Sequence, residues 1–203
     1  MGHNSQLMQS RISNLFLCLL WLGFAIRHLN HYLEYRSLTT LLFIAMETLA
    51  ALMFLFRSQT KSYSRISFDW VVAISAQVLP FLFAPSALGL SYQLGSALMI
   101  SGAILNILAL LSLNRSLAIV PAERSIKTSG LYRLIRHPMY LSYLILYSGY
   151  LLASTSAWNA AIFLLTITLL FMRTVFEERF LGAVGEYQDY RSNVKYRLIP
   201  LIY

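Results

Sequence analysis

The chain has 203 residues, of which 58% are hydrophobic and only 12% are charged. This composition excludes a soluble globular protein, because a soluble surface must be covered by polar groups, and it indicates an integral membrane protein. The net charge of +8 does not indicate nucleic acid as a partner, since the basic residues lie at the ends of apolar runs, where they suit the anionic headgroups of a lipid bilayer.

Apolar runs predict an all-α fold of about six transmembrane helices, since a span needs about 20 mostly apolar residues. The runs cover residues 12–29, 38–56, 70–84, 90–113, 138–153 and 158–176. Only a few polar residues separate the last two runs, so we expect a C-terminal helical hairpin followed by a polar C-terminal segment. The first run has no small-residue cleavage site after it and is expected to remain as a membrane helix.

Lysine and arginine residues predict the orientation in the membrane. They follow the second, fourth and sixth runs, whereas the connectors around Ser86 and Thr155 carry none. The positive-inside rule therefore places both termini, the connector of residues 114–136 and the C-terminal segment on the cytoplasmic side. Arg27 and Arg36 then lie on the opposite side, as exceptions to the rule. We expect the protein in the inner membrane of a cell.

Two polar clusters flank the predicted hairpin. Their residues are Tyr132, Arg133, Arg136 and His137 before the first helix, and Glu177 and Glu178 at the end of the second. Because the two ends of a hairpin lie side by side, we expect the clusters to form the walls of one site. Pro138 suits the first turn of a helix, where its missing N–H group costs nothing. Unpaired N–H groups at this helix start, together with the arginines, are expected to attract a carboxylate.

The polar residues occur in an ordered set that resembles a known family. The set consists of Ser129-Gly130 through Tyr132, then Arg136-His137-Pro138-Met139-Tyr140, Glu177-Glu178, Glu186-Tyr187, Tyr190 and Arg197-Leu198-Ile199-Pro200. Residues 114–203 thereby resemble the isoprenylcysteine carboxyl methyltransferase family and its phospholipid N-methyltransferase relatives, which often carry glycine where this chain has Ser142. The resemblance implies transfer of a methyl group from S-adenosyl-L-methionine to a carboxylate, amine or thiol of a small or lipid-like apolar acceptor, at a site that faces the cytoplasm.

The resemblance also implies the site residues. The cofactor-binding residues are Arg133, His137, Pro138, Tyr140, Leu141, Glu178, Tyr187 and Tyr190, and the catalytic residues are Glu178, Glu177 and Arg136. Their chemistry agrees with the cofactor: arginine suits its carboxylate, glutamate suits its ammonium or sulfonium, and tyrosine rings suit its adenine and its cation. Successive helical residues point about 100° apart, so at most one of the two glutamates faces the pocket, and the preference is Glu178.

Each of these residue types also has a simpler interpretation. The arginines can contact lipid phosphates, and the tyrosines can form an interfacial aromatic belt. The glutamates can form a solvated helix end that pairs with Arg173 and Arg179. None of these interpretations explains why the residue types occur in the order of the family. No metal site is expected, because His3, His28 and His31 lack the spacing of a ligand set.

Glu47 lies in the middle of the second apolar run, where a charged side chain costs on the order of 2.5 to 3.5 kcal/mol to insert and usually faces the bundle interior or a cavity. We expect it either to bind substrate or to hydrogen-bond a neighbour such as Gln77 or Asn106. Residues 1–113 are expected to form the acceptor side and residues 114–203 the cofactor side. The alternative function is a small membrane transporter or binding protein that uses Glu47 as its coupling carboxylate, although no internal repeat supports it.

Overall fold

The structure is a computed structural model that describes residues 2–86 and 89–200, with the main chain alone for residues 2–9. The α-helices in these residues are α1 (Gly2–Tyr35), α2 (Leu38–Phe56), α3 (Ser67–Val78), α4 (Tyr92–Leu113), α5 (Pro138–Ala153), α6 (Ala157–Leu181) and α7 (Gly185–Asn193). The short elements are the strands β1 (Ser62–Tyr63) and β2 (Ala122–Glu123) and the 3-10 turns η1 (Leu79–Leu82), η2 (Asn114–Ser116) and η3 (Gly130–Arg133).

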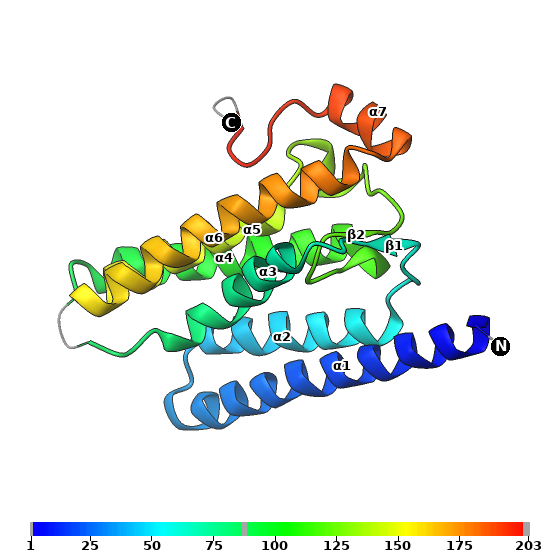
Figure 1. Cartoon of the computed structure of the whole chain (residues 1–203). Helices are drawn as coiled ribbons and strands as arrows, with labels where there is room; N and C mark the ends of the chain where they lie inside the picture. The colour runs from blue at the N-terminus through cyan, green and yellow to red at the C-terminus, as the bar shows by residue number, and fades with distance from the viewer. Residues whose placement is uncertain (1, 87–88, 201–203) are drawn as a thin grey trace.

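The long helices pack side by side in a bundle (Figure 1). α1 packs along α2, and α2 in turn packs on α4. α4 makes its most extensive contact with α5, while α3 lies against α6. α7 follows the end of α6 and lies far from the pair of α1 and α2 (Figure 1). The bundle therefore has α1 and α2 on one side, and α6 with α7 on the other.

Among the described residues, four helices are long and apolar enough to cross a membrane: Ser10–Tyr35, Leu38–Phe56, Tyr92–Ser116 and Ala157–Leu181. Exposed apolar side chains on them, such as Phe16 and Leu164, suit contact with lipid tails. The sequence predicts six spans, but the third predicted span is the short helix Ser67–Leu82 and the fifth, α5, has 16 residues. At 1.5 Å per residue each measures about 24 Å, less than the hydrocarbon thickness, so the count of six stays a prediction.

The last long helix extends beyond its apolar run. α6 continues past residue 176, where that run ends, to Leu181, so Glu177 and Glu178 lie inside the helix, as expected for these two residues. Charged residues continue a helix as well as apolar ones do when their side chains find partners in the fold. The apolar run therefore marks the part of the helix that suits lipid, and the helix itself is longer.

The connector of residues 114–136 contains more structure than the sequence indicates. It holds η2, β2 and η3, and β2 pairs antiparallel with β1, with Ser62 opposite Glu123 and Tyr63 opposite Ala122. This ribbon ties the loop after α2 to the connector after α4. It fixes the connector against the N-terminal half of the bundle.

Glycine residues let α4 and α5 approach each other closely. A Cβ atom at Gly102 would lie 2.7 Å from the backbone nitrogen of Leu146, and one at Gly149 would lie 2.6 Å from the carbonyl oxygen of Gly95. Small residues allow the backbones of membrane helices to meet in this way. The interface between α4 and α5 therefore leaves no room for larger side chains at these positions.

A buried hydrogen bond crosses the same interface. Asn106 Nδ2 donates to Ser142 Oγ at 2.8 Å, and Ser142 Oγ donates to the carbonyl of Met139 at 2.6 Å. Ser142 is completely buried, so its hydroxyl needs partners inside the protein. The serine at a position where the resembled family often has glycine thus has a partner on α4.

We expect Gly102→Ala to destabilise the fold by about 1–3 kcal/mol, because the added methyl group meets the main chain of α5. Gly23→Ala is the matched control in another membrane helix, since a Cβ atom there meets nothing within 4 Å and alanine favours the helix. Thermal unfolding of the two variants in detergent measures the difference. An unfolding temperature of Gly102→Ala at or above that of Gly23→Ala would contradict the close packing.

Candidate functional site

A cavity of about 510 Å³ lies among α1, α2, α4, α5 and α6. Its lining on α2 runs from Thr40 to Phe54, about 21 Å at 1.5 Å per residue, so the cavity extends along most of that helix. At one end it is lined by charged and aromatic residues, which we call the foot: Tyr132, Arg136, His137, Tyr140, Arg173 and Glu177. Apolar side chains line the rest of it, among them Leu146, which lies six residues and about 9 Å beyond Tyr140 along α5.

The chain turns sharply before α5, and this turn positions the foot. Gly130 has a φ of +60°, a conformation that favours glycine, and it begins η3. Pro138 is the first residue of α5, as the sequence predicts, and His137 is the N-cap. The N–H group of Tyr140 donates to the carbonyl of His137 at 3.1 Å, and that of His137 donates to the carbonyl of Arg197 at 2.9 Å, so the prediction of unpaired N–H groups is wrong at these two positions.

Tyr140 is at the centre of the foot. Its hydroxyl donates to Glu177 Oε2 at 2.7 Å. The ring of His137 stacks on the ring of Tyr140, with centroids 5.3 Å apart and planes 8° from parallel. The guanidinium carbon of Arg173 lies 5.2 Å from the centroid of the same ring. The foot thus combines a carboxylate, a guanidinium and flat aromatic surface around one tyrosine.

Glu178, the next residue on α6, has a different set of partners. Its Oε1 accepts a hydrogen bond from Arg136 Nε at 2.8 Å and lies 3.0 Å from His137 Nε2, and its Oε2 forms an ion pair with Arg197 Nη2 at 2.8 Å. Only 4% of Glu178 is exposed, so its carboxylate is buried among these groups. We call these four residues the polar lock. A buried carboxylate persists only with such partners, because burial removes its hydration.

Main-chain contacts join the polar lock to the C-terminal segment. Four hydrogen bonds link the start of α5 to this segment. Arg136 Nη1 donates to the carbonyls of Val194 and Lys195, at 2.8 Å each. The main-chain N–H groups of Arg136 and His137 donate to the carbonyls of Tyr196 (3.0 Å) and Arg197 (2.9 Å). Arg197 adds its ion pair with Glu178. The C-terminal segment is thereby held against the residues that line the foot.

Tyr187 and Tyr190 of α7 lie in an apolar cluster beside the foot, together with Tyr132, Leu181 and Val194. The hydroxyl of Tyr190 donates to the carbonyl of Tyr132 at 2.7 Å. Burial, with a smaller contribution from nearby carboxylates, raises the pKa of the Tyr187 and Tyr190 hydroxyls well above the ordinary value, so both stay protonated. These two tyrosines support η3 and do not line the cavity.

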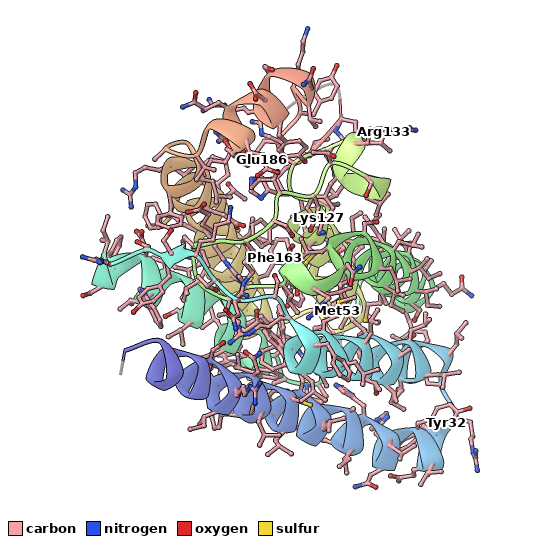
Figure 2. The ribbon with its side chains drawn as sticks, turned by 90° about the vertical axis from the view of Figure 1, so that its right-hand side faces the viewer. Tyr32, Met53, Lys127, Arg133, Phe163 and Glu186 are labelled. Carbon is pink, nitrogen blue, oxygen red and sulfur yellow. The ribbon has the colours of Figure 1, made fainter. Side chains whose placement is uncertain are left out.

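The structure places the predicted site residues in two groups. Arg136, His137, Tyr140, Glu177 and Glu47 line the cavity. The lining does not include Arg133, Pro138, Leu141, Glu178, Tyr187 or Tyr190. Arg133 is exposed and lies at the edge of the molecule (Figure 2). Most of the second group therefore supports the foot from behind.

The simpler interpretation of the glutamates as a solvated helix end is wrong for Glu178. Glu178 is buried, and the arginines expected to pair with the glutamates have other partners. Arg179 forms an ion pair with Asp69 at 2.7 Å, which joins α6 to α3. Arg173 donates to the carbonyls of residues 118 and 119 in the connector.

Arg173 is a cavity residue that the sequence reasoning missed. It is buried and lines the foot next to Tyr140. It lies four residues before Glu177 on α6, and residues four apart share one face of a helix. This spacing was the signal that could have identified it.

We expect Glu178→Gln to destabilise the protein by about 3–5 kcal/mol, because it leaves buried cations without their carboxylate. Glu177→Gln is the control, since Glu177 is only half-buried and bonds to a neutral hydroxyl. Thermal unfolding in detergent and the rate of proteolysis at the exposed Lys195 measure the loss. Equal effects of the two substitutions would show that the polar lock does not hold the C-terminal segment.

Residues 90–185 match the family described as phospholipid methyltransferase. The matched range contains α4, η3, α5 and α6, and it includes the foot and Glu178. The family match begins at residue 90, whereas the resemblance seen in the sequence begins at residue 114. No curated protein matches the chain. Residues 90–185 are therefore a phospholipid methyltransferase domain, of the family that the isoprenylcysteine carboxyl methyltransferases share.

Proposed function

We propose that this membrane methyltransferase transfers a methyl group from S-adenosyl-L-methionine to a small or lipid-like apolar acceptor. The family supports a membrane methyltransferase. The observation that carries the finer proposal is the continuous cavity between the polar foot and an apolar interior. A water-soluble donor and an apolar acceptor need such a cavity, because the donor enters from water, the acceptor enters from the lipid bilayer, and both must bind at one site.

The residues of the foot fit the chemistry of S-adenosyl-L-methionine. When bound, this cofactor supplies an electrophilic methyl group on a positively charged sulfur, and its carboxylate, ammonium and adenine are the groups to be held. Arg136 and Arg173 suit the carboxylate, since guanidinium groups bind carboxylates well. Glu177 suits the ammonium or the sulfonium, and the ring of Tyr140 suits the adenine or a cation.

The two glutamates differ in their proposed roles. Glu177 lines the cavity and is held by Tyr140, so the geometry favours it as the carboxylate that faces the cofactor. Glu178 fixes Arg136 and His137 from behind, which makes it a positioning residue. The sequence-based preference for Glu178 as the pocket-facing glutamate stays a prediction, and an unchanged affinity of Glu177→Gln for S-adenosylmethionine in the next experiment would favour it.

The acceptor is proposed to occupy the apolar middle of the cavity, with its reacting atom turned toward the foot. α1 and α2 supply one wall of this part, in agreement with an acceptor side formed by residues 1–113 and a cofactor side formed by residues 114–203. The residues act mainly by positioning. Two reactants held together in a water-poor site react faster because the entropy of bringing them together is already lost on binding.

We expect wild-type protein in detergent to bind S-adenosylmethionine and S-adenosylhomocysteine with micromolar affinity in calorimetry. Glu177→Gln is expected to weaken binding of the positively charged S-adenosylmethionine by about tenfold, a loss of about 1.4 kcal/mol, since the amide no longer balances a cation. Glu186→Gln is the control, because Glu186 is an exposed carboxylate of α7 (Figure 2). No binding of either compound by the wild type would favour the transporter alternative.

The foot is proposed to face the cytoplasm. We expect Ser125→Cys, in the connector after α4, to resist an impermeant thiol reagent in intact cells and to react after lysis, since the positive-inside rule places this connector inside. Leu90→Cys is the matched position before α4, 75% exposed, and is expected to react from outside. The reverse pattern would overturn the orientation.

A further inference from the structure

A second polar group lies in the same cavity, away from the foot. Glu47 lies in the middle of α2, is only 9% exposed and lines the cavity. Its Oε1 is 3.9 Å from His28 Nε2, too far for a hydrogen bond, and its Oε2 has no hydrogen-bond partner among the described residues. Asn106, one of the neighbours predicted to bond it, donates to Ser142 instead.

A carboxyl oxygen in this position needs a partner. Buried polar groups in native proteins nearly always form hydrogen bonds. Leaving such a group unpaired in a membrane span is costly, because lipid tails have no group that forms a hydrogen bond with it. Since the Oε2 atom of Glu47 belongs to the lining of a cavity that can hold a ligand, we infer that its partner is carried by the ligand.

The charges beyond Glu47 restrict what this partner can be. Arg27, His28 and His31 of α1 line the same part of the cavity, and His31 Nδ1 lies 3.4 Å from the hydroxyl of Thr40. Arg27, which carries a permanent positive charge, disfavours an ammonium group on the ligand. An uncharged hydroxyl avoids the repulsion, and it can bond to a carboxyl group in either protonation state because it both donates and accepts.

The packing of α2 sets the spacing between Glu47 and the foot. Ala50 and Phe54 of α2 pack in one cluster with Met139, which is next to Tyr140 of the foot. Glu47 lies about 4.5 and 10.5 Å before these two residues along the axis of α2, so it lies roughly 5–10 Å from the foot in that direction.

We propose that Glu47, supported by His28, forms a second polar subsite that binds a hydroxyl group of the methyl acceptor. This inference rests on the proposed function and specifies its substrate class. The acceptor is an amphiphile with two polar groups, one that receives the methyl group at the foot and a hydroxyl that reaches Glu47. The segment between them is apolar and spans roughly 5–10 Å.

A matched pair of fatty acids of about eight carbons tests the subsite, one unsubstituted and one with a terminal hydroxyl group. Their affinities for the full chain in detergent are measured by calorimetry, with and without S-adenosylhomocysteine. We expect wild-type protein to bind the hydroxy acid about tenfold more tightly, because the site otherwise leaves a buried oxygen unpaired. Glu47→Leu is expected to abolish this preference, and Glu47→Gln to reduce it, since an amide oxygen accepts a weaker hydrogen bond.

The controls separate the subsite from other effects. Glu34→Gln changes an exposed carboxylate at the end of α1 and is expected to keep the full preference. Equal affinities of the two acids for the wild type, or an unchanged preference in Glu47→Gln, would overturn the proposal even if Glu47→Leu does not fold. A matching acid with a terminal amine that binds more tightly than the hydroxy acid would also overturn it.

The same measurements distinguish this inference from the proposed function. A preference for the hydroxy acid that depends on Glu47, in a protein that does not bind S-adenosylhomocysteine, would support the subsite and reject methyl transfer. Binding of S-adenosylhomocysteine without any preference between the acids would support methyl transfer and reject the subsite.

Discussion

The buried contact of Glu178 with Arg136, His137 and Arg197 is the interaction on which the geometry of the foot depends. It joins three segments that are distant in the chain: the end of α6, the start of α5 and the C-terminal segment. Charges withdrawn from water must satisfy one another, so each member of the polar lock constrains the others. Arg136 and His137, which line the cavity, are thereby oriented by residues that do not line it.

The packing of the bundle is uneven, and this unevenness creates the cavity. α4 and α5 meet through glycines with no space between their backbones. On its other side α4 packs on α2, and the long cavity lies between these two helices, α1 and the hairpin of α5 and α6. In the most apolar window of α1 only 11% of the residues are buried. This helix therefore forms a wall of the cavity whose outer face is not covered by other helices.

The sequence predicted those features of the fold that depend on local patterns. The bounds of α2 and α5 agree with the apolar runs, and the hairpin begins at Pro138 as expected. The true length of α6 could not be read from its apolar run, because its charged last turn is stabilised by Asp69 and by the polar lock, which are contacts with other segments. Helix ends that depend on such contacts leave no local signal.

The site residues also divide into those that local sequence patterns indicate and those that depend on contacts between distant segments. The residue types and their order indicated the foot, and Arg136, His137, Tyr140 and Glu177 do meet at one cavity. Which glutamate turns toward that cavity depends on the rotation of α6 against α5, a tertiary property with no counterpart in the sequence. Arg173 does not stand out in the sequence as a site residue, because it lies within a mostly apolar stretch and outside the polar clusters at the helix ends.

The range that matches the family, residues 90–185, contains the foot but none of α1 or α2, although these two helices form a wall of the same cavity. The foot and this wall are therefore built from separate parts of the chain. A substitution in α1 or α2 changes the shape of the cavity and leaves the contacts of Glu178 with Arg136 and His137 in place. These two helices are the region in which the molecules that fit the cavity can be altered by engineering without disturbing the foot.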